Sequence, residues 1–145
     1  MTSTLLHPTT PATDTRRPLA KAGLAAAVVA SAATATVAAL AHASGVSLDL
    51  SGKPIPVSGF ATLTFAFSLV GLAIASVLTR KATRSRTQFL RTTGCLLLLS
   101  FVPDLTADAA ASTKATLMLT HLVAAAVVVP VLANRLADRR TTAVA

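Results

Sequence analysis

Residues 115–134 read ATLMLTHLVAAAVVVPVLAN and contain no Asp, Glu, Lys or Arg. At a rise of about 1.5 Å per residue, an α-helix of about 20 apolar residues crosses the roughly 30 Å hydrocarbon core of a bilayer. Basic residues border the stretch on both sides, since Lys114 precedes it and Arg135 follows it. The segment therefore predicts a transmembrane helix, and the rest of the chain can be interpreted around it.

Two other stretches, residues 22–43 and 57–79, also lack Asp, Glu, Lys and Arg. The first is mostly alanine and only weakly hydrophobic, which favours a position against other helices over one that faces lipid alone. The second contains Gly71 and Ala75, a small-xxx-small pair that lets two helix backbones approach closely. We expect both stretches to be membrane spans, separated by a loop rich in Gly and Pro.

A further candidate span, residues 89–108, is less clear. Its uncharged part, residues 92–102, is too short to cross a bilayer and is followed by Pro103 and Asp104. Either the helix continues through residues 105–107, with Asp104 inside the membrane and Pro103 as a kink, or the segment is re-entrant. The count of spans given below favours the crossing helix.

The composition points to the same class of protein. Of the 145 residues, 53% are hydrophobic and 12% are charged, against about 25% charged in an ordinary soluble domain. The net charge of +8 could indicate nucleic-acid binding, but the chain has no Trp or Tyr on which bases could stack. A single cysteine excludes an internal disulfide and a cysteine-based zinc site. We therefore expect a membrane protein with no nucleic-acid partner.

The distribution of basic residues predicts the orientation of the chain. In the five segments outside the expected spans, Lys and Arg number 3, 1, 5, 1 and 3 along the chain. Because Lys and Arg are enriched in short cytoplasmic loops, both termini and the middle loop are expected inside the cell, which requires an even number of spans. The prediction is an all-α, four-helix bundle over residues 19–140 in the plasma membrane. A disordered N-terminal tail (1–18) and a short C-terminal tail (141–145) flank the bundle.

The N-terminal region has a second interpretation. Residues 15–21 (TRRPLAK) and the sequence AHA at 41–43 look like a twin-arginine export signal with an A-x-A site, which predicts cleavage after Ala43. The alternative is an uncleaved first span with a basic collar. We prefer the uncleaved span, because the apolar stretch exceeds the roughly 7 to 15 residues of a signal core and three more apolar stretches follow.

Three features of the loops and the last span are shared with a known family. They are the breaker-rich segments Gly45-Val-Ser-Leu-Asp-Leu and Pro54-Ile-Pro-Val, the basic middle loop, and His121-Leu-Val-Ala-Ala-Ala-Val-Val-Val-Pro130. In these features, over about residues 20–137, the chain resembles a family of small, uncharacterised membrane proteins common in actinobacteria, with four predicted spans. The resemblance implies a membrane location and a four-helix bundle, and it brings no reaction, ligand or catalytic residue.

Asp104 and His121 are the best candidates for a functional site. Counted along the helices, Asp104 would lie about 22 Å from the cytoplasmic side and His121 about 10 Å from the outer side. In a core of about 30 Å these depths are similar, so the two side chains can meet. Asp108, one turn after Asp104 on the same helix face, and His42, at the end of the first span, complete an outward-facing cluster.

Two interpretations of this cluster stay open. In the first it is a proton or ion site, in which a histidine changes its charge near neutral pH. In the second, His121 is bonded to a backbone carbonyl or a threonine, while Asp104 and Asp108 cap the outer end of the third span. No helix carries an H-x-x-x-H spacing, so we predict no metal ligand, no cofactor-binding residue and no catalytic residue.

Five basic residues, with no acidic one among them, occupy the middle loop and the start of the third span. Their simplest role is to set the topology and to attract anionic lipid headgroups at the cytoplasmic face, at about 1 kcal/mol per basic residue near the surface. They are Arg80, Lys81, Arg84, Arg86 and Arg91. Cys95 has no base placed to activate it, so we expect an inert packing residue rather than a nucleophile.

These observations favour a structural or interaction protein of the plasma membrane, an accessory that forms part of a larger complex or a homo-oligomer. Alanine- and glycine-rich helices suit such tight packing. The alternative is a proton-linked small transporter or channel subunit that uses the Asp and His cluster. An enzyme is not expected, because the chain has no nucleophile–base pair and no metal motif.

Overall fold

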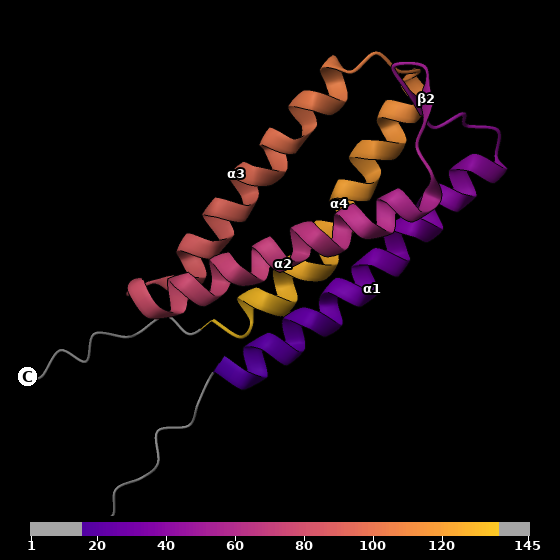
Figure 1. Ribbon diagram of the computed structural model, residues 1–145. Coiled ribbons are helices and arrows are strands. Elements are labelled where there is room, and N and C mark those ends of the chain that lie inside the picture. Colours follow the sequence, from indigo (N-terminus) through magenta and orange to yellow (C-terminus); the bar gives the residue numbers. More distant parts are fainter. Residues whose placement is uncertain (1–15, 137–145) are drawn as a thin grey trace, which may run out of the picture.

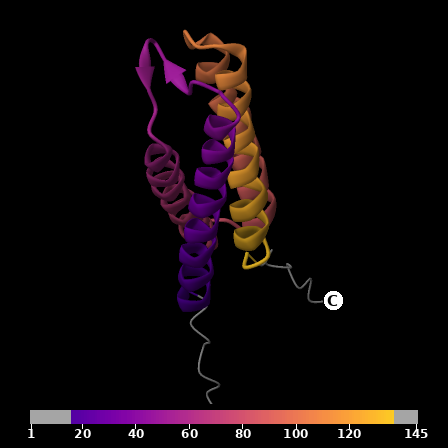
Figure 2. The ribbon, with the colours of Figure 1, turned by 90° about the vertical axis from the view of Figure 1, so that its right-hand side faces the viewer.

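Four long helices and one short hairpin make up residues 16–136, the part of the chain that the computed structural model describes. Successive helices run in opposite directions, so α1 begins and α4 ends at one end of the bundle, while the hairpin lies at the other (Figure 1, Figure 2). We call these the terminal end and the hairpin end. All four helices are long and apolar enough to cross a membrane, which confirms the all-helical fold with four candidate spans. They are α1 (Arg16–Ala43), α2 (Val57–Lys81), α3 (Ser85–Thr106) and α4 (Ala111–Ala133).

The observed helix bounds differ from the predicted spans by a few residues. The third and fourth helices each begin four residues before the predicted starts at 89 and 115, because charged and polar residues form their first turns. The third helix is continuous through Pro103. The first helix already includes residues 16–18, which were assigned to the N-terminal tail. The other tail residues, 1–15 and 141–145, lie outside the described part.

Small side chains let α1 pack closely against α2 and α4. Ala27, Ala30 and Ala38 are fully buried. A Cβ atom placed on Gly23 would lie 2.6 Å from Leu72 Cδ1 of α2 and 3.2 Å from Leu132 Cδ2 of α4. The alanine-rich α1 thus occupies an inner position in the bundle, as its small side chains predict.

The described core consists of two apolar clusters, one towards each end of the bundle. The cluster at the terminal end gathers residues of all four helices, among them Leu19, Ala75, Phe89 and Leu132. Helix α3 contributes little else to the interior and lies at the edge of the bundle, against α4 and α2 (Figure 1). Most of its leucines therefore remain on the outer surface.

At the hairpin end the loop between α1 and α2 folds back over the helices. Strands β1 (Asp49–Leu50) and β2 (Lys53–Pro54) pair through a turn at Ser51 and Gly52, both with positive φ angles. Such angles suit a tight hairpin turn. Leu48 also has a positive φ of 54°, which is unfavourable for a bulky residue, yet its side chain is only 1% exposed. It anchors the loop in the second cluster, against Ala38 and Phe60.

The outer surface of the bundle is apolar along all four helices. Phe67 of α2 is 70% exposed and Leu98 of α3 is 69% exposed, and many other large apolar side chains are similarly uncovered. A water-soluble monomer rarely exposes such extensive apolar surface. The surface is therefore the kind that contacts lipid.

Several hydroxyl groups inside the helices form hydrogen bonds within their own helix or with the next one. Ser31, Ser68 and Ser76 each donate to the carbonyl oxygen four residues earlier, at 2.6 to 2.8 Å. The hydroxyls of Thr34 in α1 and Thr64 in α2 bond to each other at 2.9 Å. Because lipid offers no partner for a polar group, these bonds let serine and threonine occupy the spans.

Candidate functional site

Asp104 lies near the hairpin end of α3, two residues before the helix ends at Thr106. The side chain is only 9% exposed, although the acid stands directly after Pro103 in a helix that is mostly on the surface. Proline leaves the carbonyl of Leu99 without its usual helical donor, but the helix is completed beyond it by the bond from Ala107 N–H to Pro103 O at 2.9 Å. The sequence therefore carries a carboxyl group into the interface between α3 and α4.

His121 faces this carboxyl group from α4. Its Nδ1 atom lies 3.0 Å from Asp104 Oδ2 and 2.9 Å from the carbonyl oxygen of Leu117. Phe101, one turn before Asp104 on α3, places its ring edge-on to the imidazole with 6.3 Å between ring centroids. The imidazole is thus held from both helices, while 39% of its side chain remains exposed.

The geometry around Nδ1 requires a proton at this point. The carbonyl oxygen of Leu117 can only accept, so the Nδ1 atom 2.9 Å away must carry a hydrogen whatever the state of the Asp104 carboxyl group. The imidazole Nδ1 has hydrogen-bond geometry towards Leu117 O, whereas Asp104 Oδ2 is buried and has no hydrogen bond. The Asp104 carboxyl group thus lies beside the imidazole as a close polar neighbour, while the hydrogen bond of Nδ1 goes to the Leu117 carbonyl.

The other two residues of the predicted cluster, Asp108 and His42, do not lie beside Asp104 and His121. Asp108 lies beyond the end of α3, so it is not on the same helix face as Asp104, and it is exposed. Its carbonyl oxygen accepts a bond from Ser51 N–H of the hairpin at 2.8 Å. His42 is exposed in the last turn of α1, with Nδ1 3.4 Å from Val46 O. Among the described residues no three His, Cys, Asp or Glu side chains are grouped as a metal site would need.

The predicted basic residues gather at the terminal end. All five are exposed, and they occupy the end of α2, the connection after it and the first two turns of α3. They are Arg80, Lys81, Arg84, Arg86 and Arg91. This end of the bundle is consequently positive on its surface.

A comparison with protein-family models gives a match over residues 14–138 to a family of unknown function, DUF6069. The chain belongs to this family. For DUF6069 no activity is described, and the match covers all four helices as well as both residues of the Asp104–His121 pair. No curated protein matches the chain, and no solved structure does.

Sequence reasoning missed three polar residues of the α4 interior and misplaced one residue of α3. Thr113, Thr116 and Thr120 are buried on one face of α4, and the Thr113 hydroxyl has no hydrogen-bond partner among the described residues. Their spacing of three and four residues is the available sign, since it places them on one helix face. Cys95, expected to be a packing residue, is exposed.

Proposed function

We propose that the protein is a non-catalytic structural or accessory protein of the plasma membrane, which acts by binding other membrane components. The main support is how the polar and apolar groups divide along the bundle. The Asp104–His121 pair lies in the half towards the hairpin end, and the interior of the other half is filled by apolar side chains such as Phe89, Val128 and Leu132. Between residues 16 and 136, this apolar cluster leaves no continuous polar route along the bundle for a solute to cross.

The proposed orientation places both termini and the α2–α3 connection in the cytoplasm. Among the described residues the terminal end carries Lys21, Arg135 and the five basic residues named above, whereas the hairpin end carries Lys53 and Lys114. Such an imbalance is the usual mark of the cytoplasmic side.

Site-specific photo-crosslinking in native membranes tests the accessory role. A photoreactive amino acid is placed at exposed positions, one on each helix: Val28 in α1, Phe67 in α2, Leu98 in α3 and Leu119 in α4. An accessory protein should give a discrete protein adduct of one mass from one or two of the four positions. Adducts to lipid alone at every position, in membranes from the native cell, would contradict the proposal.

The contact between Asp104 and His121 favours a second candidate, a proton-linked transporter or channel subunit. Ionisable residues within a membrane often belong to proton or ion pathways. Because the interior of one chain is closed, this function would need further copies or a partner to complete the path. Proton flux into proteoliposomes at pH 6 and pH 8 tests it, with His121→Ala as the variant and the exposed His42→Ala as the control. A flux that His121→Ala abolishes and His42→Ala preserves would replace the accessory role by this one.

A further inference from the structure

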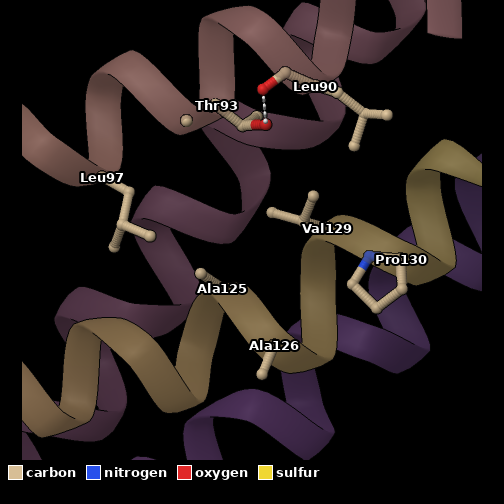
Figure 3. A pocket seen from close by; sticks show the side chains of 8 residues that line it. Leu90, Thr93, Leu97, Ala125, Ala126, Val129 and Pro130 are labelled. Atoms are coloured by element: carbon tan, nitrogen blue, oxygen red, sulfur yellow. Dashed lines mark hydrogen bonds between the residues drawn. The ribbon is translucent and has the colours of Figure 1, made fainter. Parts of the chain in front are cut away.

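A groove of about 290 Å³ runs between α3 and α4 in the half of the bundle towards the terminal end. Figure 3 shows side chains of α3, including Leu90 and Leu97, on one side of it and side chains of α4, including Val129, on the other. Its distance from the terminal end is given by α3, which begins at Ser85. Leu90 and Leu97 lie about 7.5 Å and about 18 Å along the helix from that residue. The lining residues are Leu90, Thr93, Gly94, Leu97, Ala125, Ala126, Val129 and Pro130.

The lining suits a hydrocarbon chain. Its single polar side chain is Thr93, whose hydroxyl already donates to the carbonyl oxygen of Phe89 at 2.8 Å, with Leu90 O at 3.3 Å. A Cβ atom placed on Gly94 would meet nothing within 4 Å, so the groove is wide there. No side chain of this lining has an unsatisfied hydrogen-bonding group that a polar ligand could use.

Three positive charges lie at the same end of the bundle as the groove. Arg86 lies one helical turn before Leu90 on the same side of α3, and Arg91 lies beside Leu90 on the neighbouring side of the helix. Arg135 lies in the turn just after α4 and five residues beyond Pro130. All three are exposed, and the basic residues of the hairpin end, Lys53 and Lys114, lie at the opposite ends of the helices. An apolar groove with cations near one of its ends matches a molecule with an anionic head and an apolar tail.

We infer that this groove binds one anionic phospholipid. An acyl chain lies between α3 and α4, and the phosphate lies at Arg86, Arg91 and Arg135. Basic sites between transmembrane helices are suited to anionic headgroups, and each basic residue near the surface contributes. The same charges disfavour a second copy of this chain at the groove, because its own basic end would have to approach them.

The acyl part of the site is tested by photo-crosslinking of the full-length protein. The probe is phosphatidylglycerol with a photoreactive group in its acyl chain, incorporated in phosphatidylcholine vesicles. Ala126→Leu fills the groove, and Ala66→Leu makes the same change at an exposed position of α2. We expect adducts on residues 90–97 and 125–130, reduced at least fivefold by Ala126→Leu and unchanged by Ala66→Leu. Equal labelling of α2, or labelling that Ala126→Leu leaves unchanged, would overturn the inference.

The headgroup part is tested by titrating the detergent-solubilised protein with phosphatidylglycerol or phosphatidylcholine of identical chains and counting bound lipid by native mass spectrometry. Replacing Arg86, Arg91 and Arg135 by Gln should weaken phosphatidylglycerol binding roughly 100-fold. Replacing Arg80, Lys81 and Arg84 by Gln removes the same charge at the same end and should change it less than threefold. Equal effects of the two triple variants, or equal binding of the two lipids, would show only general attraction to a charged surface. Either result would overturn the inferred headgroup site. Unchanged thermal unfolding establishes that each variant is folded.

Discussion

Asp104 can remain buried in the bundle because the His121 side chain lies next to its carboxyl group. A carboxyl group within the hydrocarbon region is costly unless it faces the interior and has a partner. Here the partner is an imidazole 3.0 Å away, itself fixed by the Leu117 carbonyl and by the edge contact with Phe101. A pair of this kind contributes little net stability, but removal of His121 leaves the buried carboxyl group of Asp104 uncompensated.

A double-mutant cycle on this pair measures that asymmetry. His121→Leu leaves the carboxyl group of Asp104 buried without its partner, so we expect it to lower the free energy of unfolding by about 1 to 3 kcal/mol. Asp104→Leu combined with His121→Leu should recover most of the loss, because both polar groups are then gone. Unfolding in mixed micelles, followed by circular dichroism, gives the values. Strict additivity of the two single effects would mean that the pair does not interact.

Leu48 is the residue whose backbone conformation is least expected from its type. A positive φ at a bulky side chain costs on the order of 1 to 3 kcal/mol, and the complete burial of Leu48 offsets that cost. Leu48→Ala should lower the free energy of unfolding by about 2 to 5 kcal/mol. The matched change Leu50→Ala, at an exposed neighbour in β1, should cost under about 1 kcal/mol. The same unfolding assay compares them, and similar losses would show that Leu48 is no anchor.

Helix packing can be probed with two glycines in comparable helical settings. A Cβ atom at Gly23 would press on Leu72 and Leu132, whereas one at Gly94 would meet open space. Gly23→Ala should therefore destabilise the bundle by about 1 kcal/mol, at the low end of the usual overpacking cost because leucine ends can rotate. Gly94→Ala should not destabilise it. If Gly94→Ala proved the more harmful in thermal unfolding, the assignment of α1 to the inner position would be wrong.

The four helices are visible in the sequence, but the faces they present to one another are not. The apolar stretches and their basic borders predict α1, α2 and α4, and the even number of spans favours a full helix at α3. In a bilayer the lipid-facing surface is as apolar as the interior, so hydrophobic periodicity does not separate the two. This is why Cys95 was taken for a packing residue and why the groove beside Gly94 gave no signal in the sequence.

The candidate site shows the same limit. Counting residues along two helices was enough to place Asp104 and His121 at a similar depth, and the structure holds them 3.0 Å apart. Asp108 was placed on the same face only because α3 was expected to run to 108, whereas it ends at Thr106. Helix ends are set by local hydrogen bonds that an apolar pattern does not report, so residues near them are the hardest to assign.

The packing of α1 bears on whether the chain is cut after Ala43. Ala27, Ala30 and Thr34 are fully buried against neighbouring helices, and Thr34 bonds to Thr64 of α2. Removal of α1 would uncover these surfaces on α2 and α4. We therefore expect the intact mass of the protein purified from its native membrane to include residues 19–43. A mature form that begins at Ser44 would contradict this expectation.

The bundle as a unit is asymmetric in charge along its axis and closed by apolar residues in one half. Both features follow from where Lys, Arg and the large apolar residues stand in the sequence relative to the helix ends. They argue together for a fixed orientation in the bilayer, with the apolar cluster and the groove in the leaflet beside the basic residues. The orientation thus decides which leaflet supplies the lipid of the groove.

Cysteine labelling in intact cells tests this orientation directly. In a Cys95→Ser background, Ser47→Cys places a thiol in the exposed loop of the hairpin end, and Thr83→Cys places one in the exposed α2–α3 connection. Because five basic residues surround the second position and disfavour its export, a membrane-impermeant maleimide should label Ser47→Cys at once and Thr83→Cys only after the membrane is permeabilised. Labelling of Thr83→Cys in intact cells would show that the bundle has the opposite orientation. The anionic lipid inferred above would then have to come from the outer leaflet.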